Sequence, residues 1–202
     1  MHGPVGVLAL QGDFAEHRQA LERRGVTVRL VRRPADLRGV VGVVLPGGES
    51  TTMLRLLRLE ALDRPIADLA RAGLPVLATC AGLILCARSV SGPEQPSLGL
   101  LDVDVQRNGY GRQVHSGTFP LRGSVLPPGT TGVFIRAPRI RRCGPGVEVL
   151  ARRDEDPVLV RQGAVLGACF HPELEHNHPV TEMFVAQLRS PRAAAGAATG
   201  GR

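Results

Sequence analysis

The sequence predicts an α/β fold of three layers, in which a mostly parallel, doubly wound sheet carries helices on both faces. Short apolar runs alternate with longer amphipathic segments through residue 90, as in chains that build parallel sheets. The apolar runs are continuous rather than alternating, which indicates strands covered on both faces. With 202 residues the chain is long enough for a full core, and we expect one domain over residues 1–190.

The elements of the first half follow from the period of the apolar residues and from the residues that end each run. VVGVVLP, for example, is a Val-rich run of the kind found in buried strands, and Gly25 is a helix-ending residue. The expected order is a strand over 5–10, a helix over 15–25, strands over 26–32 and 40–46, an amphipathic segment over 52–73, a strand over 74–79 and a helix from Ala81.

The second half consists of shorter strand-like pieces that glycine and proline interrupt, and these predict a small antiparallel patch attached to the main sheet. The pieces are 98–106, 112–121, 131–137, 147–152, 156–163 and 165–170. We expect the last of them to return to the main sheet and the helix over 180–189 to close the fold. Residues 191–202 are small, polar and low in complexity, so we predict a disordered tail.

The positive charge invites a nucleic-acid interpretation, which the residue types do not favour. The formal net charge is +7, but every cationic residue is arginine and these are scattered along the chain. One tyrosine, five phenylalanines and no tryptophan leave few platforms for stacking bases. We therefore expect a solvated charged surface and no nucleic-acid partner, with RIRR (139–142) kept as a possible contact for an acidic protein.

Other features of the chain predict a cytoplasmic protein. No run approaches the roughly 20 apolar residues that cross a membrane. MHGPVGVLAL enters a strand-like segment at once, without the features of a signal peptide. The four cysteines form no CxxC pair, so we expect reduced thiols. They are Cys80, Cys86, Cys143 and Cys169.

Cys80 lies where the strand over 74–79 meets the following helix, between the small residues Thr79 and Ala81. A sharp turn of this kind exposes a nucleophile, and the positive end of the helix dipole favours a thiolate. The alternative is that Cys80 fills a gap in the core, as buried cysteines commonly do. We assign that packing role to the other three cysteines.

FHPELEHNH, 170–178, supplies a base and a residue to orient it. His171 follows a strand directly, and Glu173 lies two residues further on, so the carboxylate can hold the imidazole in one tautomer. A surface histidine beside an unrelated acid is the alternative. Glu175, His176 and His178 lack helical i, i+4 spacing, so we expect no metal.

PGGES, 46–50, follows the third expected strand and offers a turn of two glycines. Such a turn can point a backbone amide into the site. The amides of Gly48 and of Ala81, which follows Cys80, would then form an oxyanion hole. The alternative is a glycine turn that starts a helix with Ser50 or Thr51 as its N-cap, and both can hold together.

Six segments together resemble one known family. They are LALQGD (8–13), LPGGESTTM (45–53), TCAGLILCA (79–87), VQRNGYGRQV (105–114), VFIRAP (133–138) and FHPEL (170–174). In this order they are similar to the PdxT/SNO family, the glutaminase subunits of pyridoxal 5′-phosphate synthase complexes. The similarity runs from about residue 5 to 189. PGGESTT combined with TCAGL and RNxxGRQ carries most of its specificity.

The resemblance implies a class I, triad-type glutamine amidotransferase with a flavodoxin-like sheet. Its implied nucleophile is Cys80, its general base and acid His171 and its orienting carboxylate Glu173. The residues implied to bind L-glutamine are Gly47, Gly48, Glu49, Arg107, Ile135 and Arg136. It also implies that the chain uses no metal or cofactor, and that ammonia passes through a channel to a (β/α)8-barrel synthase subunit within a large hetero-oligomer.

Three residues depart from the family pattern without touching the implied triad. Tyr110 replaces a phenylalanine, His115 an aspartate and Glu175 a threonine. Two other functions stay open: a glutaminase that serves another biosynthetic synthase, and a non-catalytic or redox-sensing thiol scaffold on the same kind of sheet. The scaffold would keep Cys80 but would need neither His171 nor Glu173.

Overall fold

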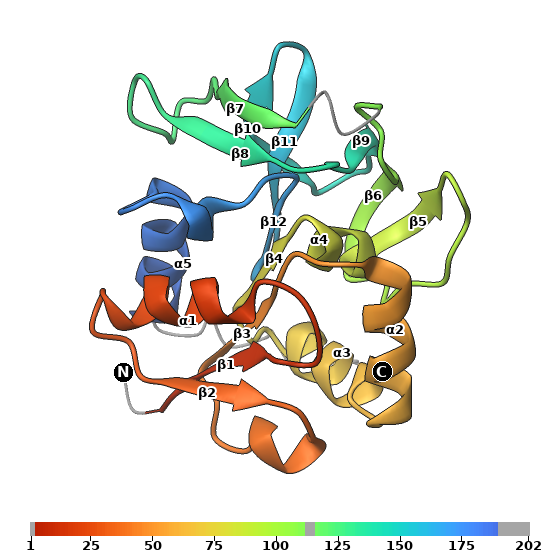
Figure 1. Cartoon of the computed structure of the whole chain (residues 1–202), viewed down its shortest axis with the longest axis vertical. Coiled ribbons are helices and arrows are strands. Elements are labelled where there is room, and N and C mark those ends of the chain that lie inside the picture. Colours follow the sequence, from red (N-terminus) through yellow and green to blue (C-terminus); the bar gives the residue numbers. More distant parts are fainter. Residues whose placement is uncertain (1–2, 112–115, 190–202) are drawn as a thin grey trace, which may run out of the picture.

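A seven-stranded sheet forms the centre of the molecule (Figure 1) in a computed structural model that describes residues 3–111 and 116–189. Five neighbouring strands of this sheet are parallel. In spatial order they are β2 (Val28–Val31), β1 (Val5–Leu8), β3 (Gly42–Leu45), β4 (Val76–Thr79) and β12 (Val165–Ala168). This order is the flavodoxin-like one, and it confirms the predicted parallel sheet and the return of residues 165–170 to it.

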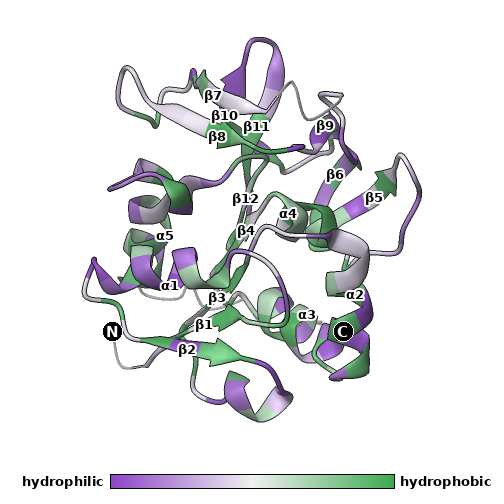
Figure 2. Cartoon of the chain, in the orientation of Figure 1, coloured by the Kyte–Doolittle hydropathy of each residue, from purple (hydrophilic) through white to green (hydrophobic). Residues whose placement is uncertain are grey.

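Helices cover both faces of the sheet, as predicted. Figure 1 shows α1 (Phe14–Glu22) and α5 (Pro179–Arg189) on one face. The other face carries α2 (Ser50–Leu59), α3 (Asp63–Arg71) and the short α4 (Ala81–Cys86). Figure 2 shows the central strands as largely hydrophobic, and β1, β3, β4 and β12 are buried along their whole length. The core therefore lies on both sides of these strands.

The other strands lie in three places, whereas the sequence suggested a single antiparallel patch. β11 (Asp156–Gln162) and β10 (Glu148–Arg153) extend the main sheet beyond β12. β5 (Ala87–Ser91), β6 (Leu101–Gln106) and β9 (Arg139–Cys143) form a second sheet. β7 (Gly117–Pro120) and β8 (Thr131–Phe134) form a third. The predicted antiparallel pairing is therefore present, although it is divided among three sheets and β5 pairs with β6 in parallel.

Two of the predicted helical segments are interrupted. The amphipathic segment over 52–73 divides into α2 and α3, with Ala61 in a left-handed conformation (φ 53°) between them. Pro65 lies in the first turn of α3, where its missing N–H is tolerated. The helix from Ala81 lasts only to Cys86, after which the chain enters β5. Two 3₁₀ turns, η1 (Pro34–Leu37) and η3 (Pro172–Leu174), complete the elements named here.

Some sequence predictions fall outside the described residues. These are the disordered tail over 191–202 and the departure at His115. The boundary of a single domain over 1–190 lies at the edge of the described part and stays a prediction. None of the described helices is both long enough and apolar enough to span a bilayer.

Candidate active site

The loops that follow four parallel strands meet at one edge of the main sheet. Leu45 at the end of β3 pairs with Ala78 in β4, and Thr79 at the end of β4 pairs with Ala168 in β12. The amide of Asp13, in the loop after β1, donates to the carbonyl of Gly47 after β3 at 3.2 Å. Because the carboxyl ends of parallel strands share an edge, the QGD and PGGES segments, Cys80 and His171 come together there.

Cys80 forms a sharp turn between β4 and α4, as its small neighbours predicted. Its backbone has φ 47° and ψ −102°, a combination that non-glycine residues rarely adopt. The Cys80 amide donates to the carbonyl of Ala168 at 2.8 Å, which fixes the turn to β12. A side chain at Gly82 would collide with the carbonyl of Leu45, so only glycine lets the helix leave the sheet this closely.

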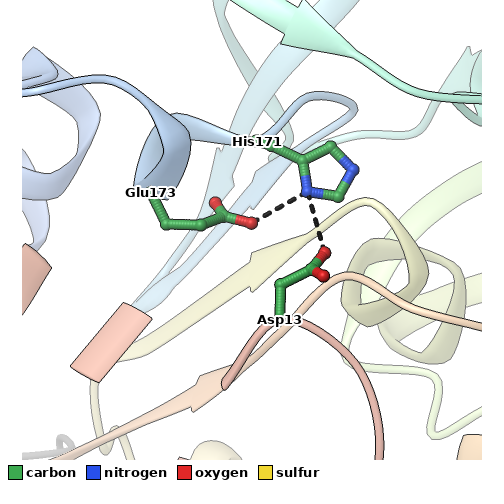
Figure 3. A group of neighbouring side chains, drawn as sticks. All are labelled: Asp13, His171 and Glu173. Atoms are coloured by element: carbon green, nitrogen blue, oxygen red, sulfur yellow. Dashed lines mark hydrogen bonds and ion pairs between the residues drawn. The ribbon is translucent and has the colours of Figure 1, made fainter. Parts of the chain in front are cut away.

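The imidazole of His171 is held by two carboxylates (Figure 3). Its Nδ1 donates to Oε1 of Glu173 at 2.8 Å and lies 3.3 Å from Oδ2 of Asp13. Glu173 comes from η3 and is fully buried, whereas Asp13 precedes α1 and is partly exposed. The other ring nitrogen points away from both carboxylates (Figure 3). This nitrogen is left to exchange a proton with a reacting group.

The surroundings of His171 favour its protonated form. Burial alone would lower its pKa, but hydrogen bonding to Asp13, Cys80 and Glu173 outweighs burial and raises the pKa well above the ordinary value. The same hydrogen bond lowers the pKa of Asp13, so that its carboxylate stays ionised. The arrangement therefore stabilises a positive charge at the base, next to the thiol of Cys80.

Positions 47 and 48 require glycine because neighbouring atoms leave no room for a side chain. A Cβ at Gly47 would meet Cε1 of His171, and it would lie 2.8 Å from Oδ2 of Asp13. Gly48 has φ 148°, and a Cβ there would lie 2.5 Å from Oε1 of Gln11. That same Gln11 oxygen accepts a hydrogen bond from the amide of Glu49 at 2.9 Å. The QGD loop and the two-glycine turn thus form one packed unit beside His171.

The two amides predicted to form an oxyanion hole are those of Gly48 and Ala81. Among the residues that the structure describes, neither the Gly48 nor the Ala81 amide donates a hydrogen bond to a protein oxygen. An amide must be unoccupied in this way to stabilise a developing oxyanion. The N-cap alternative holds at the same turn, although the capping residue is Glu49, whose carboxylate accepts from the amides of Thr51 and Thr52.

A pocket of about 450 Å³, its open mouth included, lies next to Cys80. It is lined by Gly48, Glu49, Ser50, Cys80, Ile84, Arg107, Asn108, Ile135 and Arg136. Five of the six predicted glutamine-binding residues belong to this lining, whereas Gly47 lies against His171 instead. Arg107 and Glu49 form an ion pair at 2.9 Å within it. The pocket thus offers groups of both charges to a zwitterionic ligand.

Several site residues were not identified from the sequence. Asp13 lies in the QGD motif, but its proximity to His171 depends on the sheet order. His17 is buried in α1 and touches Glu173. Its spacing of three and four residues from the buried Ala20 and Leu21 was a signal that it faces inward. Ser50, Ile84 and Asn108 complete the pocket.

His178, the last residue of the HNH segment, has a structural role. Nε2 of His178 donates to the carbonyl of Thr131 at 2.8 Å, and its Nδ1 accepts from the amide of Val180 at 3.1 Å. Within the described ranges, the group whose ligand atoms lie close enough for a metal ion is Asp13, His171 and Glu173. In this group the protonated Nδ1 of His171 lies between the two carboxylates. Hydrogen bonding of the imidazole to Asp13 and Glu173 therefore accounts for their proximity without a metal ion.

The remaining candidates have structural surroundings. Cys86 and Cys169 are buried, and burial raises the pKa of the Cys86 thiol to about 12. Tyr110 packs edge-on against Phe134, with ring centroids 5.9 Å apart. In RIRR, Arg139 pairs with Asp156, Arg141 with Gln106 and Arg142 with Asp102 and Asp104. These internal contacts engage the arginines that an acidic partner would need.

The chain is similar in sequence to known proteins over most of its length. The chain is 51% identical over 190 residues to the pyridoxal 5′-phosphate synthase subunit PdxT of Koribacter versatilis, covering 92% of this chain and 96% of that protein. It is 52% identical over 186 residues to the subunit of the same name from Deinococcus radiodurans, covering 90% and 95%.

Solved structures give the same result. A crystal structure of a glutamine amidotransferase superposes with a TM-score of 0.87 at 46% identity, covering 92% of this chain and 99% of that one. PurLQS from Thermotoga maritima, at 20% identity and a TM-score of 0.69 over 93% of this chain and 98% of that one, shares the fold. Residues 7–190 match the SNO family. The chain belongs to the SNO glutamine amidotransferase family.

Proposed function

We propose that this chain hydrolyses L-glutamine to L-glutamate and ammonia and delivers the ammonia to a synthase subunit that makes pyridoxal 5′-phosphate. One observation carries the proposal: a strained cysteine turn, a histidine held by a buried glutamate and a pocket with an arginine meet at one sheet edge. Relatives about 50% identical over nine-tenths of the chain are pyridoxal 5′-phosphate synthase subunits.

In the first step, the thiolate of Cys80, whose proton has passed to His171, attacks the side-chain carbonyl carbon of glutamine. The carbonyl oxygen becomes an oxyanion, which the amides of Gly48 and Ala81 stabilise. His171 then gives its proton to the amide nitrogen, the carbon–nitrogen bond breaks and ammonia leaves. The raised pKa of His171 supports this role, because it keeps the imidazole protonated until the leaving group needs the proton.

In the second step, water attacks the thioester carbon. The imidazole of His171, now neutral, takes a proton from the water, and the bond between carbon and sulfur breaks to release glutamate. Glu173 keeps the Nδ1 proton on the ring throughout, so that the opposite nitrogen exchanges protons. Apart from glutamine and one water molecule, both steps use only side chains and backbone amides of this chain.

Glutamine binding follows from the charges of the pocket. A free glutamine carries an α-carboxylate and an α-ammonium group. The guanidinium of Arg107, paired with Glu49 at 2.9 Å, is suited to clamp the carboxylate. Glu49 can then accept from the ammonium group, and the carbonyl oxygen of Ile135, 4.0 Å from Sγ of Cys80, lies close to the reacting carbon.

We infer that the partner is a separate (β/α)8-barrel synthase subunit in a large hetero-oligomer, and that the complex is cytoplasmic. The decisive experiment combines the full chain with the synthase subunit and measures pyridoxal 5′-phosphate formation with glutamine and with free ammonia. Cys80→Ala should lower the rate of pyridoxal 5′-phosphate formation with glutamine by several orders of magnitude. The rate with free ammonia should not change. Equal activity of Cys80→Ala and wild type with glutamine would refute the assignment.

The same experiment separates the remaining alternatives. A glutaminase that serves a different synthase would release glutamate but support no pyridoxal 5′-phosphate formation with this partner. A thiol scaffold would release no glutamate under any of these conditions. No observation among the described residues favours either alternative over the proposed function.

A further inference from the structure

A second histidine lies directly behind the base and its orienting carboxylate. His17, in α1, is 2% exposed. Its Nε2 lies 3.0 Å from Oγ1 of Thr79 and 3.3 Å from Oε2 of Glu173. α1 also packs against η3, the turn that carries Glu173. His17 thus contacts both the carboxylate and the residue that precedes Cys80.

The carboxylate of Glu173 needs a second donor. Its side chain has no exposed surface, and Oε1 accepts from His171 at 2.8 Å. Oε2 is buried and makes no well-aligned hydrogen bond with a described residue. The Nε2 of His17 lies within ion-pair distance of it. A buried carboxylate oxygen without a donor is strongly disfavoured, so this contact decides whether Glu173 keeps its orientation.

The proton of His17 can be assigned from these contacts. Burial lowers the pKa of His17 despite the nearby Glu173, so the ring is neutral and carries one N–H. A proton on Nδ1 would leave the lone pair of Nε2 facing the Glu173 oxygen, which is repulsive. A proton on Nε2, which lies 3.0 Å from Oγ1 of Thr79 and 3.3 Å from Oε2 of Glu173, turns the positive end of the N–H toward both oxygens, so the Nε2–H tautomer is the one that fits.

We propose that His17 is a positioning residue of the glutaminase reaction, which holds Oε2 of Glu173 so that Oε1 stays on Nδ1 of His171. The proposal rests on the proposed function. Thr79 fixes the ring of His17 from the residue just before Cys80. A continuous path of contacts therefore connects the backbone of the nucleophile, through His17 and Glu173, to the base.

Two polar substitutions of similar size test this role. The amide nitrogen of glutamine reaches about where Nε2 of histidine lies, whereas that of asparagine reaches only to Nδ1. His17→Gln therefore keeps a donor for Glu173, and His17→Asn removes it. We expect His17→Asn to lower kcat by on the order of 10²-fold, as about 1 Å of misplacement does, with little change in KM. His17→Gln should stay within a few-fold of wild type.

The assay measures glutamate release by the full chain with the synthase subunit, over a range of glutamine concentrations. Leu21→Ala is the control for damage to α1, because Leu21 is buried in the same helix. It should lower the melting temperature but leave kcat unchanged. The downfield proton resonance of His171 Nδ1–H gives a second readout, which should persist in His17→Gln and disappear or shift in His17→Asn.

The outcomes separate this inference from the proposed function. No glutamate release by wild type would overturn the proposed function itself. An active wild type with equal kcat for His17→Asn and His17→Gln would overturn the positioning role alone. A fall in kcat for Leu21→Ala as large as for His17→Asn would also overturn it, because general loosening of α1 would then explain the loss.

Discussion

Replacing Gly47 with alanine is expected to displace His171 and slow the glutaminase reaction. The added Cβ would lie 2.8 Å from Oδ2 of Asp13 and 2.9 Å from Nδ1 of His171, and nearer still to Cε1 of that ring. An ordinary contact begins at about 3.4 Å, so 3.4 − 2.9 gives a displacement of at least about 0.5 Å for Nδ1 of His171. Cε1 of the same ring is the nearest atom and must move further, so the ring is displaced away from the turn.

The size of the effect follows from that displacement. Because about 1 Å of misplacement costs on the order of 10²-fold in rate, we expect kcat to fall by about 10- to 100-fold, or about 1.4–2.7 kcal/mol. Overpacking of this kind also costs about 1–3 kcal/mol of stability. The melting temperature should therefore fall by several degrees while the chain stays folded.

Gly117 provides the matched control. Like Gly47 it lacks a positive φ, but a Cβ at Gly117 would make its nearest contact at 3.4 Å, with the ring of Phe119. Glutamate release and thermal unfolding would be measured for both variants with the synthase subunit present. Gly117→Ala should behave as wild type in the rate assay. A folded Gly47→Ala protein with kcat within about threefold of wild type would refute the reasoning from close approach.

Three further outcomes are expected. A glutamine-analogue affinity reagent should label Cys80, and Cys86→Ala should retain most activity, because Cys86 is buried in α4; labelling of Cys86 alone would contradict this. Asp13→Asn should lower stability at pH 7 by about 1 kcal/mol or less, measured by urea unfolding. Because the pKa of Asp13 is depressed in the folded state, this difference should vanish as the pH falls below 3.8 and through that pKa. Arg107→Lys should raise the KM for glutamine about tenfold, because lysine cannot form a bidentate clamp; an unchanged KM would argue against Arg107 as the clamp.

The parallel strands could be predicted because a strand buried on both faces appears in the sequence as a continuous apolar run. β3 and β4 are continuous apolar runs, and each ends in residues that only a turn accommodates. The same signal located Cys80 and Gly48, since both follow such runs directly. Pro65 lies in the first turn of α3, a helix-start signal that the prediction of a single amphipathic segment does not use. Strand order, register and the partners of the short β-strands depend on contacts between distant segments, so no local sequence pattern predicts them.

The two carboxylates that contact His171 differ in how far they lie from it in the sequence, and only the nearer one could be predicted. Glu173 was predictable as the partner of His171 because only two residues separate them. Asp13 is 158 positions away from His171 along the chain (171 − 13), and β1 and β12, which precede these two residues, are separated in the sheet by β3 and β4. The short length of α4 has a similar cause. The chain leaves the helix at Ala87 because that residue pairs with Leu101 in β6.

The backbone conformation of three pocket residues lowers the thermal stability of the fold. Cys80, Asn108 and Arg136 line the pocket with φ of 47°, 48° and 44°, conformations that cost residues with a side chain about 1–3 kcal/mol where they are sparsely populated. Glycine would relieve this cost at Arg136. Selection of variants for thermal tolerance alone would therefore favour glycine at Arg136 and remove a side chain that we propose binds glutamine. Laboratory evolution of this enzyme should select for turnover and stability together.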